Sequence, residues 1–237
     1  MKKNYMGAFA LVCALIVSFA FFGCGDSENG GVAGGGKVNG DTKPEDIISQ
    51  RLTEEEWKAA FDDANFVNFT ENGKVFVDLN GQLYEMPLIT TRVDSNKEYT
   101  TSSLFGENNG YYTSIENGKR YNYTLDEVTK KWKRELFEPL YEGDNDIFIY
   151  WIFKDGFADF TYSEEEKAYV AATYPTDGYT ILTEDPLINL KLKFVDGKLS
   201  YMEYSVDGEN DLVGTTGAIG VLFYDYGTTS VTLPSLS

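Results

Sequence analysis

Four Asn-Gly or Asp-Gly dipeptides, each between runs of β-branched and aromatic residues, constrain the fold of this chain more than any other feature. A type I′ turn needs positive φ at both central residues, which Asn, Asp and Gly tolerate, so these dipeptides predict tight β-hairpins. They are Asn72-Gly73, Asn80-Gly81, Asn117-Gly118 and Asp196-Gly197. We therefore expect a meandering antiparallel sheet.

The runs beside these turns alternate as half-buried strands do. Three alternating sets stand out: Leu190, Leu192 and Phe194; Met202, Tyr204 and Val206; and Tyr121, Tyr123 and Leu125. The 17 Tyr and 16 Phe of the chain suit a pleated surface that is buried on one side. No repeat of about 20–50 residues is visible, which argues against a propeller or a solenoid.

A helix is predicted to begin just after Thr53. Thr53 and Glu56 have the spacing of a capping box, and Leu52 and Trp57 have that of a hydrophobic staple. Four apolar residues then recur at helical spacing and would share one face: Trp57, Ala60, Phe61 and Ala64. We expect this stripe to pack against the sheet.

The segment from Asp144 to Gly156 contains seven consecutive apolar residues, Ile147 to Phe153. Its length fits either a helix or a buried strand. A cap at Asp144 and a stop at Gly156 favour a helix, whereas isoleucine and aromatic residues favour a strand. A helix here could be a lid over a hydrophobic ligand. Ordinary core is the commoner explanation of an element that is apolar on every side.

Residues 1–23 have the layout of a secretory signal peptide. Lys2 and Lys3 precede an apolar run, Tyr5 to Phe22. The segment Phe21-Phe22-Gly23-Cys24 resembles a bacterial lipobox, which implies that Cys24 carries diacylglycerol and acyl chains such as palmitate. The mature protein would then be anchored in the cell membrane and face outside the cytoplasm, at the cell surface or in the periplasm. An uncleaved single anchor and an ordinary secreted protein are the alternatives.

Residues 24–46 are rich in Gly, Asn and Asp, which predicts a flexible tether, and we expect residues 47–237 to form one domain. Cleavage of the signal would leave 18 basic and 38 acidic side chains, a formal charge of −20. Such a domain is repelled by an anionic membrane surface, so the lipid would hold it near while the tether keeps it clear.

Composition excludes several kinds of chemistry. The chain has no histidine, which excludes Ser-His-Asp and Cys-His catalysis and His-ligated metals, and its acid excess argues against nucleic acid. A carboxylate pair is the remaining route to catalysis, but spacing alone identifies none. The acidic clusters at 142–146 and 207–211 lack the spacing of a calcium loop and are predicted to be solvated turns. We assign no catalytic residue, metal or cofactor.

The segment Lys130-Lys131-Trp132-Lys133-Arg134 is a basic island in an acidic chain. It could receive an anionic head group or a wall polymer, with Trp132 stacking on a sugar or a cation. Alternatively, it is an edge strand kept soluble by its lysines, which is the commoner use of such charges.

Two segments resemble parts of the LolA-type carriers and of the LppX and LprG lipoproteins. The run from Phe223 to Pro234 is similar to their closing strands, and Phe157 to Tyr162 followed by Tyr169 is similar to the strand after their lid helix. The resemblance covers about Glu45 to Ser237. It implies a curved half-barrel sheet whose inserted helices enclose an apolar cavity for acyl chains.

We therefore predict an α+β fold: a curved antiparallel sheet, or half β-barrel, with an N-terminal helix and a lid helix on its concave face. The leading hypothesis is a membrane-anchored surface lipoprotein that binds or carries a hydrophobic, lipid-like ligand. The alternative is a non-catalytic structural or interaction module with a filled core and an unidentified protein partner. The ligand-lining candidates are Trp57, Phe61, Trp132, Tyr150, Trp151, Phe153 and Phe157.

Overall fold

A computed structural model of the chain describes residues 37–79, 82–102, 110–126, 128–137, 150–175, 186–206 and 217–236. The predicted signal peptide, Cys24 and both acidic clusters lie outside these ranges. Among the described residues, no helix has the length and apolar character needed to cross a bilayer.

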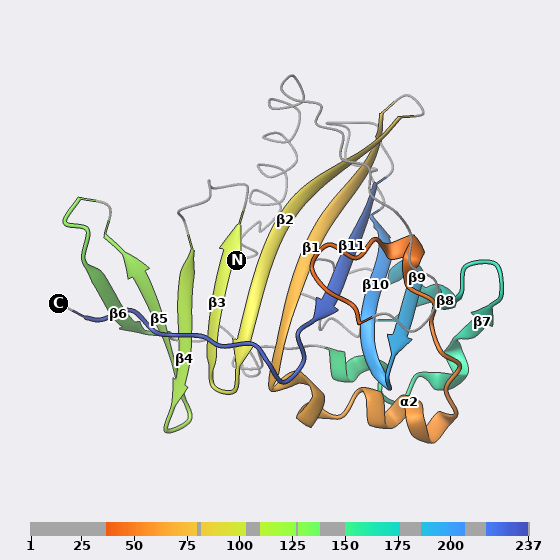
Figure 1. Cartoon of the computed structure of the whole chain (residues 1–237), viewed down its shortest axis with the longest axis horizontal. Helices are drawn as coiled ribbons and strands as arrows, with labels where there is room; N and C mark the ends of the chain where they lie inside the picture. Colours follow the sequence, from red (N-terminus) through yellow and green to blue (C-terminus); the bar gives the residue numbers. More distant parts are fainter. Residues whose placement is uncertain are drawn as a thin grey trace, which may run out of the picture.

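The described strands form one open antiparallel sheet of eleven strands in the order β6-β5-β4-β3-β2-β1-β11-β10-β9-β8-β7 (Figure 1). Two meanders are joined where β1 pairs with β11, so the predicted fold class is confirmed. The strands are β1 Asn68–Leu79, β2 Gln82–Asp94, β3 Lys97–Ser102, β4 Tyr111–Glu116, β5 Lys119–Leu125, β6 Trp132–Leu136, β7 Thr161–Ser163, β8 Ala168–Tyr174, β9 Leu187–Val195, β10 Lys198–Val206 and β11 Gly217–Tyr224.

Two of the predicted hairpin turns are confirmed. Asn117 and Gly118 join β4 to β5 with φ of 53° and 72°, and Asp196 and Gly197 join β9 to β10 with φ of 52° and 72°. Positive φ at both central residues is the signature of a type I′ turn, whose twist matches that of the flanking strands. Residues 80 and 81 lie outside the described residues, and the strands on either side pair from Leu79 and Gln82.

The hairpin predicted at Asn72-Gly73 is wrong. Both residues lie inside β1, and a β-bulge follows between Gly73 and Lys74. A Cβ on Gly73 would lie 3.0 Å from Cγ2 of Ile89 on β2, so the glycine serves a close approach between strands rather than a turn. A turn that the dipeptide rule missed joins β2 to β3 at Ser95-Asn96, where Ser95 has φ of 57°.

The one α-helix in the described ranges, α2 (Glu54–Ala60), begins as predicted. Thr53 Oγ1 accepts from the backbone N–H of Glu56, and the Glu56 carboxylate accepts from the backbone N–H of Thr53 at 2.7 Å. The helix ends sooner than expected, because Asn65 Nδ2 donates to the carbonyl of Ala59 at 2.8 Å. Ala64 consequently lies in the 3-10 turn η2 (Asp63–Phe66) and is exposed.

Three further 3-10 turns complete the described elements: η1 (Pro44–Asp46), η4 (Tyr150–Phe153) and η5 (Phe157–Asp159). The predicted helix at 144–156 is described only from Tyr150 onward, where the chain forms η4.

Residues 37–46, assigned to the tether from composition, contact the sheet. Val38 packs in a small cluster with Ile47, Tyr201 and Leu222, and Lys193 Nζ donates to the carbonyl of Pro44 at 2.8 Å. Leu222 and Phe223 are neighbours on β11 and therefore point to opposite faces. This segment accordingly covers the face opposite to the main core, which holds Phe223.

Candidate functional site

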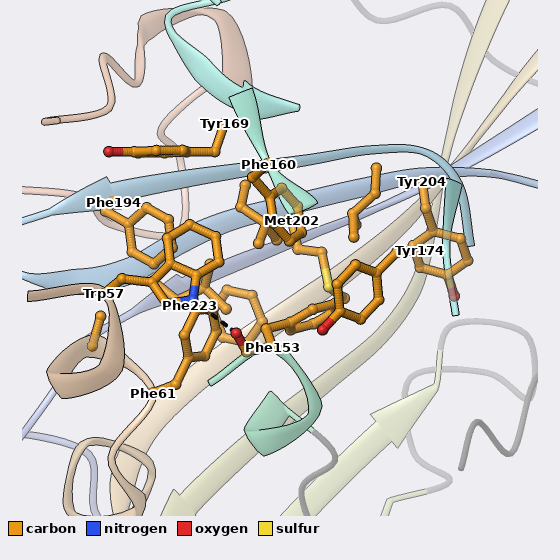
Figure 2. Close-up of a cluster of buried hydrophobic side chains, with 14 of the residues drawn as sticks. Trp57, Phe61, Phe153, Phe160, Tyr169, Tyr174, Phe194, Met202, Tyr204 and Phe223 are labelled. Carbon is orange, nitrogen blue, oxygen red and sulfur yellow. Dashed lines mark hydrogen bonds between the residues drawn. The ribbon is translucent and has the colours of Figure 1, made fainter. Parts of the chain in front are cut away.

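The main core is a cluster of aromatic rings centred on Trp57 (Figure 2). The Trp57 ring lies 4.9–5.7 Å, centroid to centroid, from five other rings: Phe61, Phe157, Phe160, Tyr169 and Phe194. Its indole Nε1 donates to the carbonyl of Phe153 at 2.7 Å, and its side chain is fully buried. This bond fastens the 150–160 segment onto α2.

Three tyrosines of this core donate their hydroxyl hydrogens to backbone carbonyls. Tyr174 donates to the carbonyl of Ile152 at 2.7 Å, and Tyr226 donates to that of Leu199 at 2.7 Å. The Tyr169 hydroxyl donates to the carbonyl of Leu52 at 3.1 Å. Because each ring is held at both its edge and its hydroxyl, the space between α2, the 150–160 segment and strands β8–β11 is filled by the chain itself.

The structure brings together four of the predicted ligand-lining residues. Trp57, Phe61 and Phe153 are at most 1% exposed, and Phe157 packs against their cluster. Trp132 lies far along the sheet on β6, where its ring meets Tyr112 edge-on at 5.3 Å. The side chains of Tyr150 and Trp151, like Cys24, lie outside the described residues.

On the same face, the sheet turns polar beyond β2. Residues that pair directly across antiparallel strands share a face, and one such row runs from Phe69 through Val93, Glu98 and Thr113 to Asn122. Phe69 and Val93 are apolar and buried, whereas the next three positions are polar. The apolar lining therefore stops between β2 and β3.

This polar region contains buried atoms without hydrogen-bond partners. Glu98 Oε1 accepts from Thr100 at 2.9 Å, but Glu98 Oε2 has no hydrogen bond and lies 4.0 Å from the guanidinium of Arg120. Thr113 Oγ1, Arg120 Nε and Asn122 Oδ1 are also buried and unpaired. Each buried polar atom without a hydrogen bond costs about 1–3 kcal/mol of stability. A group that supplied the missing hydrogen bonds would therefore stabilise the cluster.

A hollow of about 200 Å³ lies on the opposite face, lined by Arg92, Tyr99, Tyr112 and the tail residues 230–232. The C-terminal tail runs across the strands of this half of the sheet (Figure 1). The hollow joins strands and a tail more than 100 residues apart in sequence, so no local pattern could have revealed it.

Residues 132–134 of the basic island lie on β6, an edge strand of the described sheet, as one of the two interpretations required. Lys133 pairs with Asp126, and Arg134 pairs with Glu116 at 2.6 Å while lying 3.8 Å from the centre of the Tyr121 ring. The bond from Lys133 holds the pKa of the Asp126 carboxyl well below its usual range. Two of the cations of the island are thus already neutralised within the chain.

Metal ligands do not gather in the described part of the chain. No group of three or more His, Cys, Asp or Glu side chains there is placed to share an ion. The acidic clusters at 142–146 and 207–211 lie outside it.

The sequence matches no protein-family model and no curated protein. Five chains of solved structures match it. One is a DUF1329 family protein from Desulfovibrio piger, with 9% sequence identity, a TM-score of 0.28, and coverage of 76% of this chain and 93% of that chain. A likeness at this TM-score carries no conclusion about this chain.

Proposed function

We propose that this chain is a bacterial envelope lipoprotein, anchored through diacylglycerol on Cys24, that acts as a non-catalytic binding module outside the cytoplasm. The observation that carries the proposal is the filling of the core face. Half of that face is occupied by the rings around Trp57, and the other half is polar around Glu98.

An acyl carrier needs an apolar hollow. The described core face instead favours a polar ligand or partner, for two reasons. Opening the ring cluster would expose Trp57, Phe61 and Phe153, each of which contributes about 1.5–3 kcal/mol by burial. Beyond Val93, an alkyl chain would lie against buried carboxylate, hydroxyl and guanidinium groups that need polar partners. Both terms oppose lipid in this space and favour a polar ligand or partner.

Carriage of a hydrophobic molecule by a LolA-, LppX- or LprG-like domain is the second candidate. It is favoured by the open antiparallel sheet with a capped helix against one face. It is also favoured by the apolar run 147–153, of which residues 147–149 lie outside the described residues.

The two candidates are separated by mass spectrometry of the chain produced from residue 25 onward, which keeps every contact described above. We expect the native mass to equal the denatured mass, because side-chain rings fill the described part of the core face. A stoichiometric lipid that is present in the native spectrum and lost on denaturation would establish carriage instead.

Anchoring is tested by metabolic labelling of the full chain with an alkyne analogue of palmitate in a bacterial host. Cys24→Ala should abolish the label, whereas Cys13→Ala, the other cysteine of the chain, should keep it because Cys13 lies in the predicted signal. Label that survives Cys24→Ala, or wild-type protein that takes up none, would refute the lipoprotein assignment.

A further inference from the structure

The hollow under the C-terminal tail has a floor made from one row of paired residues. Thr70 pairs with Arg92, Arg92 with Tyr99, and Tyr99 with Tyr112, so their side chains leave the same face of β1–β4. Phe69 precedes Thr70 and belongs to the ring core. The hollow is therefore on the other side of the sheet from the core and is independent of it.

The wall of the hollow is held in place by hydrogen bonds between the tail and β1 and β2. Asn68 bonds both the backbone N–H and the carbonyl of Thr229, at 2.9 and 2.8 Å. The backbone N–H of Val231 donates to Asp94 Oδ2 at 3.1 Å, and the Val231 side chain is buried. Ser230 and Thr232, on either side of this anchor, line the hollow and supply hydroxyl groups.

Two residues of the floor form an aromatic platform. The rings of Tyr99 and Tyr112 are 4.4 Å apart at an angle of 32°, and Trp132 braces Tyr112 from its edge. A Cβ on Gly110 would lie 2.5 Å from the Tyr99 ring, so this glycine lets the ring rest on the backbone. Burial raises the pKa of the Tyr112 hydroxyl above its ordinary value.

Arg92 is the charged residue among those that line the hollow. The chain has four arginines, and the other three each face a carboxylate: Arg51 with Glu164, Arg120 with Glu98, and Arg134 with Glu116. Arg92 has no carboxylate at ion-pair distance in the described part of the chain, although the protein has 38 acidic residues.

The acid nearest to Arg92 in sequence on this face is already engaged. Both Asp94 oxygens accept hydrogen bonds, from Asn68 Nδ2 at 3.4 Å and from the backbone of Val231. The Arg92 side chain is exposed, so its planar fork of donors is open to a ligand.

These features select a ligand class. A hollow of about 200 Å³ is smaller than the about 300–1,000 Å³ of sites for drug-sized ligands and fits a single ring-sized group. One guanidinium beside an engaged aspartate suits a monoanionic carboxylate, which it can bind with two parallel bonds, better than a phosphate dianion. Aromatic faces and hydroxyls around it suit a ring with C–H faces and hydroxyl edges.

We propose that this hollow binds a sugar acid, namely one uronate unit. Arg92 binds the carboxylate, the Tyr99 and Tyr112 pair receives the C–H face of the ring, and Ser230 and Thr232 bond its hydroxyls. This inference rests on the proposed binding function and gives it a ligand class.

The test is a titration of the chain from residue 25 onward by isothermal calorimetry, with D-glucuronate as the probe. Methyl glucoside lacks the carboxylate, and acetate lacks the ring. We expect glucuronate to bind with a Kd in the millimolar range or tighter, and each partial probe to bind at least about tenfold more weakly.

Variants assign the binding to the hollow. Arg92→Gln should weaken glucuronate binding at least about tenfold, because the charge-assisted pair is lost. Arg51→Gln, which removes an exposed arginine elsewhere, should leave it unchanged. Gly110→Ala should weaken it by displacing Tyr99, with the thermal unfolding midpoint recorded to confirm that the variants remain folded.

Three results would overturn the inference: no heat with glucuronate, equal binding by wild type and a folded Arg92→Gln variant, or acetate binding as tightly as glucuronate. None of them touches the proposed function, whose failure is a bound lipid in the mass spectrum.

Discussion

The two halves of this one sheet make opposite use of the same face. Strands β8–β11, with α2 against them, present aromatic and aliphatic side chains that the chain packs into a ring cluster. Strands β3–β5 present Glu98, Thr113 and Asn122 at the corresponding positions, with buried atoms left unpaired. A continuous hydrogen-bonded ladder joins them. Backbone pairing is therefore shared by the whole sheet, whereas burial of apolar area is concentrated in one half.

This difference suggests that one half of the sheet provides most of the stability and the other half provides the binding surfaces. In the ring half, burial of apolar surface stabilises the folded state. Its side chains are therefore not accessible to a ligand unless this half unfolds. The polar half buries less apolar surface. It has buried polar atoms without hydrogen bonds around Glu98 on one face and the Arg92 hollow on the other. Four comparisons of variants test this division.

The largest contrast is expected between two tryptophans. Trp57→Ala should lower the free energy of unfolding by about 3–5 kcal/mol, because it removes the centre of the ring cluster and its bond to Phe153. Trp132→Ala should cost under about 1.5 kcal/mol, because this ring is half-buried and meets mainly Tyr112. Urea unfolding followed by circular dichroism measures both. Equal losses would show that the polar half is packed as tightly as the ring half.

The next effect concerns the buried charges of the polar half. Arg120→Met should destabilise the protein by about 2–3 kcal/mol, because it leaves the Glu98 carboxylate buried without its cation. Adding Glu98→Leu should recover most of that loss, since two apolar side chains then replace an imperfect pair. The same urea series tests this, and a double variant less stable than Arg120→Met would contradict it.

A pH dependence is expected from the ring half. Burial raises the pKa of Tyr204 to about 12, above its value of about 10 in an unfolded chain. The folded state therefore keeps this proton longer, and the resulting stability, full below pH ~10, is lost as pH rises toward 12.

Tyr204→Phe should make the fall in unfolding free energy between pH ~10 and ~12 shallower by about 2 kcal/mol, measured by urea titration at several pH values. Tyr99→Phe, in the polar half, is the control. A slope unchanged by Tyr204→Phe would mean that this hydroxyl reaches solvent in the folded protein.

The smallest effect concerns the start of α2. Thr53→Ala removes the capping side chain and should cost about 1 kcal/mol, whereas Thr53→Ser keeps the hydroxyl and should cost only a few tenths. The shift of the thermal midpoint would report both. A harmless Thr53→Ala would indicate that α2 is held by the Trp57 cluster alone.

Local chemistry could be predicted from the sequence, and contacts across the sheet could not. The cap at Thr53 and the turns at Asn117 and Asp196 each depend on a few consecutive residues, and they are found as predicted. Asn72-Gly73 has the same local signal as those turns but lies inside β1, because pairing with Ile89 over a long strand outweighs a dipeptide preference.

The candidate sites show the same limit. Trp57, Phe61 and Phe153 were identified as a group by their apolar character, but character alone could not say whether they line a hollow or fill it. Arg92 and Glu98 gave no signal, because their importance depends on which residues pair with them across β1–β5 and on where the C-terminal tail crosses.

Hydrogen–deuterium exchange tests the division of the sheet most directly, since it reports the opening free energy of each strand. We expect amides of β9 and β10 to exchange only through global unfolding, and amides of β4 and β5 to exchange through smaller openings at a measurably faster rate. Equal protection of the two pairs of strands, or faster exchange in β9 and β10, would contradict this expectation.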